Sequence, residues 1–237
     1  MKKDLLSIGD LTLEEINSIF KLSTELKKNK RKFSKVLSGK TLVLIFQKPS
    51  NRTRVSFQVG MYQLGGNSLY LSPSEINLGV RETIKDVART LSRYVDAVVL
   101  RTYEHKNVTE LAKYSDKPVI NGLSDFEHPC QVMADLYTIR EKCKKLKGVT
   151  LAYVGDGNNV CNSLLYISAK CGLNMNVATP QGYGPGKGVL SEAKAMAKSK
   201  NSSINLFTNP VEAVKEADVI YTDVWASMGV VEEAQAR

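Results

Sequence analysis

The sequence predicts an α/β fold with two domains, each a parallel sheet flanked by helices. Short apolar runs rich in β-branched residues alternate with amphipathic helical patterns along the whole chain. Such alternation implies right-handed crossovers between parallel strands. A long amphipathic pattern over residues 131–146 separates two sets of about four strands, which indicates two domains with a linking helix.

The first half of the chain contains four apolar runs of strand length and three helical patterns between them. The strands are predicted at residues 41–46, 68–71, 97–101 and 119–123. The helices are predicted at residues 55–64, 83–94 and 108–114. We therefore expect a first domain over residues 1–128 and a linking helix over residues 129–147.

The alternation restarts after the long helix and predicts a second domain over residues 148–237. Its strands are predicted at residues 150–154, 175–178, 204–207 and 219–222, and its helices at 160–170, 190–198 and 211–216. Ligands of parallel sheets bind beyond the carboxyl ends of the strands, where loops and helix N-termini converge. The loops after these strand ends are therefore the places to look for chemistry.

The composition excludes several classes of protein. No stretch approaches the roughly 18 apolar residues that span a bilayer, and the start, MKKD, opens no signal peptide. Four cysteines without a CxxC pair indicate neither a zinc site nor a disulfide framework, so we expect a cytoplasmic protein without a metal.

The net charge of +9 does not by itself indicate nucleic acid. Much of the surplus lies in Lys21–Lys40 and Arg140–Lys147, which we expect to be solvated helix faces. No basic motif interleaved with aromatic residues accompanies it, so we expect no nucleic-acid partner. A positive pocket for a small anionic substrate explains the charge equally well.

The segment after the first strand, KPSNRTR at residues 48–54, indicates a phosphate site. It puts hydroxyl, amide and guanidinium groups at a helix N-terminus, where free N–H groups and the helix dipole favour an anion. Arginine adds bidentate geometry for phosphate oxygens. The alternative is that Ser50 or Asn51 only caps the helix while the arginines are solvated. A Walker A loop is excluded, because its glycines and Gly-Lys-Ser/Thr ending are missing.

This S-x-R-T-R turn, followed by VSF, resembles the carbamoyl-phosphate loop of the aspartate and ornithine carbamoyltransferases. Asn51 replaces the usual threonine, and its amide can still donate to an oxyanion. Further matches follow in order from the Leu5 region to Gly229. They are Arg101 at a strand end, the VINGL strand, HPCQ at 128–131, GDGNNV at 155–160 and DVWASMG at 223–229. The last motif is similar to the ornithine branch of the family and is not carried by aspartate-specific relatives.

The resemblance implies a two-substrate site. It implies that carbamoyl phosphate is held by Ser50, Asn51, Arg52, Thr53, Arg101, His128 and Gln131, of which Arg101, His128 and Gln131 act in catalysis. It implies that ornithine is held by Leu123, Asn159, Asp223, Ser227 and Met228. A donor near the carbonyl oxygen would stabilise the charge that develops in a tetrahedral transition state. Phosphate is already a good leaving group, so no cofactor is expected.

Each of these residues also has an ordinary structural reading. A lone Arg closing a strand is more often a surface residue, and His128 with Pro129 is also an ordinary helix start. Asp223 could cap a helix, with Trp225 in the core. Cys130 is expected to be a packing residue. The short polar side chains of the GDGNNV turn suit an amino-acid head group, and the turn lacks the GxGxxG spacing of a dinucleotide site.

The reaction implied is transfer of the carbamoyl group to the δ-amine of L-ornithine, giving L-citrulline and phosphate. One alternative is a carbamoyltransferase for another amine, such as putrescine. The other is a truncated and catalytically impaired chain that binds carbamoyl phosphate, because family members continue past the SMG motif to an H-C-L-P motif. Family members are trimers, and Lys85 in the 79–85 segment is expected either to reach a neighbouring site or to be an exposed helix lysine.

Overall fold

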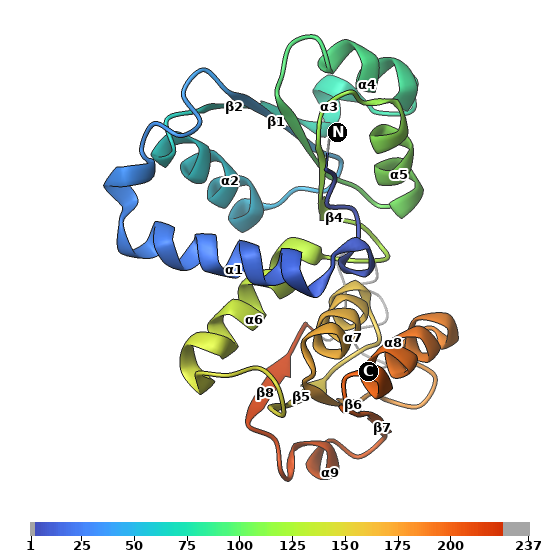
Figure 1. Cartoon of the computed structure of the whole chain (residues 1–237). Helices are drawn as coiled ribbons and strands as arrows, with labels where there is room; N and C mark the ends of the chain where they lie inside the picture. Colours follow the sequence, from blue (N-terminus) through green and yellow to red (C-terminus); the bar gives the residue numbers. More distant parts are fainter. Residues whose placement is uncertain (1–2, 225–237) are drawn as a thin grey trace. The chain divides into compact units, whose positions relative to one another are not determined.

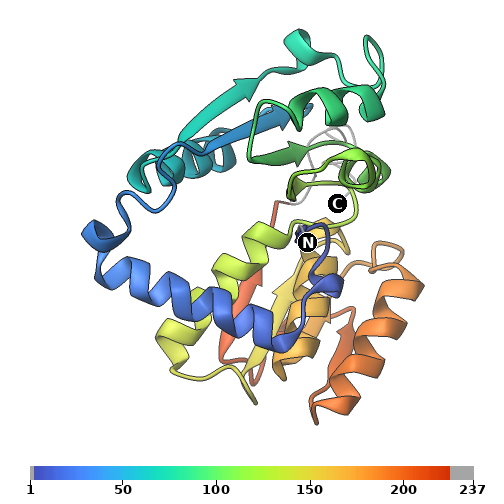
Figure 2. The same ribbon diagram turned by 45° about the horizontal axis from the view of Figure 1, so that its top comes forward.

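The computed structural model describes residues 3–224 and divides into two compact units between Cys130 and Gln131. Unit 1 carries strands β1 (Thr41–Phe46), β2 (Asn67–Leu71), β3 (Ala97–Arg101) and β4 (Val119–Leu123). They form one parallel sheet in the order β2-β1-β3-β4, and Figure 2 shows these strands as blue, teal and green arrows. The predicted α/β fold with parallel sheets is confirmed.

Helices cover both faces of the unit 1 sheet (Figure 1). The helices of unit 1 are α1 (Leu13–Lys28), α2 (Asn51–Gln63), α3 (Pro73–Ile76), α4 (Ile84–Leu91) and α5 (His105–Tyr114), with 3-10 turns η1 (Ile8–Asp10) and η2 (Lys30–Phe33). Val43 and Ile45 of β1 pack in a core with α4 and α5. Leu44 and Phe46 point to the opposite face, where Phe57 of α2 covers them. β1 is therefore buried on both faces, as expected for a central strand of a parallel sheet.

The N-terminal segment extends the sheet beyond β4. Leu5 forms a parallel bridge with Ile120, with backbone bonds from Leu5 N to Val119 O at 2.9 Å and from Asn121 N to Leu5 O at 2.8 Å. The carboxylate of Asp4 accepts from Val119 N at 2.8 Å. The first residues of the chain are thus fixed to the same edge of the sheet from which the 124–128 loop departs.

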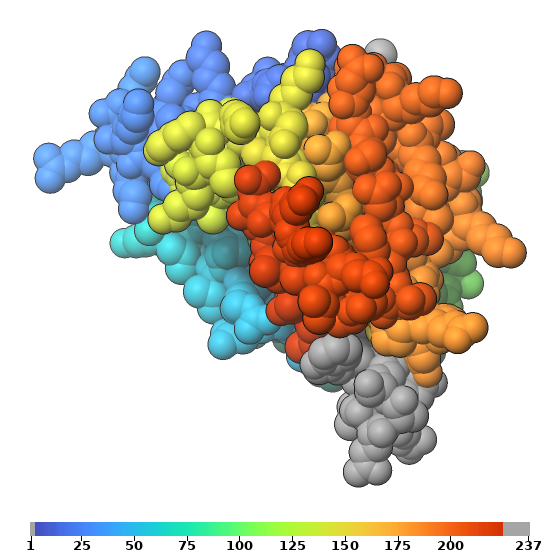
Figure 3. Space-filling model, turned by 90° about the horizontal axis from the view of Figure 1, so that it is seen from below, coloured from blue at the N-terminus to red at the C-terminus, as the bar shows by residue number. Residues whose placement is uncertain are grey.

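Unit 2 repeats the architecture around strands β5 (Thr150–Val154), β6 (Asn174–Ala178), β7 (Ile204–Phe207) and β8 (Val219–Thr222), parallel and in the order β7-β6-β5-β8. Its helices are α7 (Asn159–Cys171), α8 (Lys187–Ser199) and α9 (Pro210–Val214), and α6 (Pro129–Cys143) begins at the end of unit 1. The amide of Asn176 donates to Ala213 O at 3.0 Å and fixes α9 on β6. The β7–α9–β8 segment, orange to red in Figure 3, exposes Leu206, Val211 and Ile220.

The predicted strands match the structure closely, while helix ends differ. β2 and β6 each begin one residue before the prediction, and the other strands have the predicted bounds. Helix α2 begins at Asn51, four residues earlier, because Ser50 caps it. The apolar periodicity marks the buried face of a helix but not a polar first turn. Helix α4 ends at Leu91, where the prediction continued to residue 94.

Helix α1 was not among the predicted elements, although its N-terminus carries a full capping box of Thr12 and Glu15. The expectation of solvated helix faces for the basic runs is only half right. Lys21–Lys28 lies in α1, but residues 34–39 form turns, and α6 ends at Cys143 before the last lysines of its basic run. Within residues 3–224, no helix is both long and apolar enough to cross a bilayer.

Candidate active site

The turn after β1 presents hydrogen-bond donors at the start of α2. Ser50 is the N-cap, and its Oγ accepts from Thr53 N at 3.3 Å. The capping interpretation of Ser50 is therefore correct, yet the hydroxyl proton is still able to donate to a ligand. Asn51 and Arg52 are exposed in the first helical turn. This arrangement favours an anion, because the helix dipole and free N–H groups act in the same place.

Arg101 adds a buried cation at the same edge of the sheet, where its backbone pairs with Phe46. Its side chain is only 4% exposed, and its Nε has no hydrogen-bond partner within residues 3–224. Burial, and then the positive charge of Arg52, lower the pKa of Arg101. Burying a guanidinium close to a second cation costs free energy unless an anion binds to both.

Lys48 belongs to the same cluster of cations and was not in the predicted set. Burial lowers the pKa of Lys48, the charge of Arg101 lowers it further, and Asp125 opposes both. Its Nζ lies 4.7 Å from the ring centroid of Tyr103. Lys48 is the first residue of the KPSNRTR segment, so the sequence motif already included it. Only the fold shows that it lies near Arg101.

Arg54, the second arginine of the turn, is used in packing. Its guanidinium lies 3.6 Å from the ring centroid of Tyr70, and its Nε donates to Gln58 Oε1 at 3.2 Å. A guanidinium stacked on an aromatic face is held by the ring quadrupole. Arg52, which is exposed, and Arg101, whose Nε has no partner within residues 3–224, are therefore the guanidinium groups that remain available for an anion.

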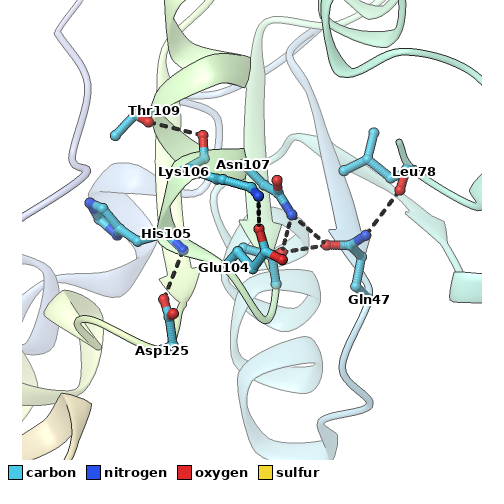
Figure 4. Close-up of polar contacts among 9 residues, drawn as sticks. Gln47, Leu78, Glu104, His105, Lys106, Asn107, Thr109 and Asp125 are labelled. Carbon is cyan, nitrogen blue, oxygen red and sulfur yellow. Dashed lines mark hydrogen bonds and ion pairs between the residues drawn. The ribbon is translucent and has the colours of Figure 1, made fainter. Parts of the chain in front are cut away.

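A polar network ties the ends of β1 and β3 together (Figure 4). The hydroxyl of Thr102 donates to Gln47 Oε1, and Asn107 Nδ2 donates to Thr102 Oγ1 at 3.1 Å. Gln47 also donates through Nε2 to Leu78 O at 3.1 Å, and its backbone N donates to Arg101 O at 2.8 Å. The network fixes the turn that carries Ser50 relative to Arg101.

The HPCQ motif lies at the start of α6, after the loop that follows β4. His128 is only 9% exposed. Cys130 donates through Sγ to Asn121 O at 3.6 Å, and burial raises the pKa of its thiol to about 12. The residue is partly exposed, but its protonated and hydrogen-bonded thiol favours the packing role expected for it.

Gln131 is oriented by Asp135, one helical turn further along α6. Its Nε2 donates to Asp135 Oδ1 at 3.0 Å, which leaves the amide oxygen of Gln131 to accept from a ligand N–H. Burial raises the pKa of Asp135, and hydrogen bonds from Gln131 and Tyr221 oppose that shift. The division of the chain assigns Gln131 to unit 2 and His128 to unit 1.

In unit 2 the loops after β5 and β8 meet, because these strands are neighbours and Val154 pairs with Thr222. Asn158 caps α7, and its Nδ2 donates to Asp223 Oδ2 at 2.8 Å. Asn159, the predicted ligand, accepts from Val160 N through Oδ1 at 2.9 Å. The structure thus brings a carboxylate and two amides together.

The glycine turn after β5 is shaped by packing. A Cβ on Gly157 would lie 2.1 Å from Pro185 N and 2.3 Å from the carbonyl carbon of Gly184, so only glycine fits there. Its N–H donates to Tyr183 O at 2.7 Å. The turn therefore binds the 183–185 loop of its own unit rather than a pyrophosphate.

The other predicted ornithine residues lie apart in the chain or outside the structure. Leu123 is in unit 1, at the end of β4, where its backbone pairs with Arg101. Ser227 and Met228 lie outside the described residues, as does Trp225. Among residues 3–224, no cluster of three or more His, Cys, Asp or Glu side chains is arranged to hold a metal.

Two family models match the chain. One describes the carbamoyl-P binding domain of aspartate/ornithine carbamoyltransferase and matches residues 3–141, and the other describes its Asp/Orn binding domain and matches residues 147–237. The ornithine carbamoyltransferase of Thermococcus kodakarensis is 53% identical over 238 residues, covering 99% of this chain and 75% of that protein. That of Anoxybacillus flavithermus is 52% identical, with coverage of 99% and 76%.

Solved structures agree with the sequence comparison. The ornithine carbamoyltransferase from Pyrococcus furiosus is similar with a TM-score of 0.95 at 53% identity, covering 99% of this chain and 76% of that one. The anabolic ornithine carbamoyltransferase from Campylobacter jejuni has a TM-score of 0.92 at 38% identity, covering 100% and 77%. The chain spans about three quarters of the length of these relatives.

Proposed function

The chain belongs to the aspartate/ornithine carbamoyltransferase family, and we propose that it transfers the carbamoyl group of carbamoyl phosphate to the δ-amine of L-ornithine. The products are L-citrulline and phosphate. Relatives at 52–54% identity over nearly the whole chain are named ornithine carbamoyltransferase. The observation in the molecule that carries the proposal is the buried Arg101, whose guanidinium needs an anionic partner.

Carbamoyl phosphate is held by unit 1 and the start of α6. Ser50, Asn51 and Thr53 donate to phosphate oxygens from the first turn of α2, and Arg52 and Arg101 neutralise the charge. Lys48 adds a third cation beside Arg101. Charge-assisted hydrogen bonds of this kind are roughly twice as strong as neutral ones.

His128 and Gln131 act on the carbamoyl group. The bond from Nε2 of Gln131 to Asp135 orients the amide, and its oxygen accepts from the carbamoyl NH₂. His128 donates to the carbonyl oxygen and stabilises the negative charge that develops there. These two contacts distinguish carbamoyl phosphate from inorganic phosphate, which has neither group.

Ornithine is held through the Asp223 carboxylate and the Asn159 amide, with Leu123, Ser227 and Met228 along its aliphatic chain. The neutral δ-nitrogen attacks the carbonyl carbon, so that a C–N bond forms and the C–O bond to phosphate breaks. The nitrogen loses its proton to the departing phosphate. Since phosphate is a good leaving group, the protein contributes mainly alignment and charge stabilisation.

The surface of α2 supports assembly into a trimer. An open groove of ≈ 470 Å³ runs along this helix from Asn51 to Gln63, and Val55 and Val59 are 49% and 44% exposed within it. A second copy of the chain covering this stripe would remove apolar surface from water. Light scattering of Val59→Glu, expected to dissociate the trimer, tests this assembly.

Lys85 does not need a neighbouring subunit to be accommodated. Lys85 lies in α4 and is half-buried rather than exposed, and its Nζ lies 5.5 Å from the ring centroid of Tyr114, which favours a helix lysine packed within its own unit. We also propose a cytoplasmic location, and the state of the cysteines supports it. All four cysteines are free, which suits a reducing compartment.

A competition between amines tests the reaction. Carbamoyl transfer to ornithine, putrescine and aspartate is compared for the 237-residue chain and for a form extended to the length of its relatives. Ornithine is expected to be the preferred acceptor. Faster transfer to putrescine would indicate the other amine specificity. Binding of carbamoyl phosphate without transfer by either form would indicate a binding chain.

A further inference from the structure

Glu127, the residue before His128, carries a fully buried carboxylate. Its side chain is 0% exposed. Oε1 accepts from the hydroxyl of Ser7, and Oε2 accepts from Ile8 N at 3.0 Å. Burying a carboxylate is costly unless its oxygens are hydrogen-bonded, so this contact is specific and well satisfied.

The segment that holds Glu127 is itself anchored. Leu5 is bridged to Ile120 at the edge of the sheet, and Asn121 Nδ2 donates to Leu6 O at 2.9 Å. Ser7 and Ile8 follow directly. Glu127 therefore connects the 124–128 loop to a strand-like segment about 120 residues away in sequence that cannot easily shift.

The opposite side of the loop rests on the first turn of α5. His105 N donates to Asp125 Oδ1 at 2.8 Å, and Figure 4 shows the two residues facing each other. His105 Nδ1 lies 2.9 Å from Ser124 Oγ, and its ring centroid lies 5.3 Å from that of Phe126. The loop is thus supported from both sides up to Glu127, and His128 is the next residue.

We propose that Glu127 is a positioning residue for His128, acting through the N-terminal segment. The carboxylate fixes the backbone immediately before the imidazole, so the ring is aimed before substrate arrives. The inference rests on the proposed function, in which His128 contacts the carbamoyl group. A misplacement of about 1 Å can cost on the order of 100-fold in rate, so anchoring the neighbouring residue has a measurable effect.

Both partners donate to the carboxylate, the Ser7 hydroxyl to Oε1 and Ile8 N to Oε2. Glu127→Leu removes both acceptors, whereas a glutamine would keep both contacts, because its amide oxygen accepts from Ile8 N and its amide N–H donates to the Ser7 hydroxyl. Ser7→Ala removes one donor from the other side of the same contact. These two variants should therefore act alike, although neither residue touches the substrate.

The test compares these variants with Asp4→Asn, a matched control. Asp4 holds the other end of the same N-terminal segment through Val119 N, away from His128. We expect Glu127→Leu and Ser7→Ala to lower kcat for citrulline formation roughly 10- to 100-fold, with KM for ornithine unchanged. Asp4→Asn should keep kcat, even where urea unfolding shows an equal loss of stability. Wild-type kcat in Glu127→Leu, or an equal loss in Asp4→Asn, overturns the proposal.

A second readout does not depend on the reaction. The chain has two histidines, so the imidazole resonances in an NMR spectrum belong to His105 and His128. Ser7→Ala and Glu127→Leu should shift or broaden the His128 signal, and Asp4→Asn should leave it in place. An unchanged His128 signal in both anchor variants contradicts the positioning role. If wild-type protein makes no citrulline, the proposed function fails while this spectrum still decides the role of Glu127.

Discussion

Asn158 donates through Nδ2 to Oδ2 of Asp223 at 2.8 Å, so the amide that caps α7 also orients the carboxylate after β8. Oδ1 of Asp223 accepts from Val224 N at 2.8 Å, and each carboxylate oxygen keeps a lone pair that can accept from an ammonium group. We predict that Asp223→Asn weakens ornithine binding at least ~10-fold, because an ion pair to the substrate is lost. Calorimetry with ornithine measures this, and Glu212→Gln, an exposed carboxylate of the same unit, serves as the control. Equal affinity in Asp223→Asn would remove Asp223 from the ornithine site.

Arg101 should dominate the binding of phosphate oxygens. Burying the charge of Arg101 costs free energy, and so does its repulsion from Arg52. A bound anion offsets both costs. Arg101→Gln should lower the affinity for inorganic phosphate about 10- to 100-fold, which corresponds to a lost charge-assisted bond. Arg93→Gln, an exposed arginine before β3, should bind like the wild type. Phosphate that stabilises wild type and Arg101→Gln equally in thermal unfolding would contradict the site.

The Gln47–Thr102 bond should contribute to stability. The Thr102 hydroxyl is fully buried, so Gln47→Ala leaves a buried donor without its acceptor. The free energy of unfolding in urea should fall by about 1–3 kcal/mol. Gln181→Ala, an exposed glutamine in the loop after β6, should change it by less than about 0.5 kcal/mol. Equal effects of the two substitutions would show that the network is not stabilising.

His105 should make stability depend on pH. Burial lowers the pKa of His105 in the folded state, with the charges of Asp125 and Asp10 opposing the shift. Between that lowered value and about 6.5, the unfolded chain binds more protons, so stability rises with pH through this window. Acidification from pH 7.5 to 5.5 should therefore destabilise wild type more than His105→Gln. Parallel stability curves for the two proteins would refute this assignment.

The sequence predicted the strands well because each is a short apolar run between turn residues. A central strand such as Thr41–Phe46 is buried on both faces, and this leaves an unambiguous pattern. The predicted N-terminus of α2 lies four residues too late, since the first turn of the helix carries the polar side chains of the proposed phosphate site. Helix α1 was missed although Thr12 and Glu15 form a capping box, a signal that the sequence did contain.

The supporting residues could not be predicted in the same way. Gln47 and Thr102 are 55 positions apart, and Ser7 and Glu127 are 120 apart. Such contacts depend on strand order, which no local pattern encodes. The motifs that face a substrate were visible as dense polar turns after apolar runs, whereas the residues that hold those turns are single polar side chains without a local signature.

The most direct test of the account follows the carbonyl carbon of ¹³C-labelled carbamoyl phosphate by NMR in the presence of L-ornithine. The protein is used in a form extended to the length of its relatives, with Arg101→Gln as the matched inactive control. The account predicts that the carbamoyl phosphate signal is replaced by the signal of citrulline, and that this conversion is lost in Arg101→Gln. No citrulline from protein that binds carbamoyl phosphate, or equal conversion by Arg101→Gln, would contradict it.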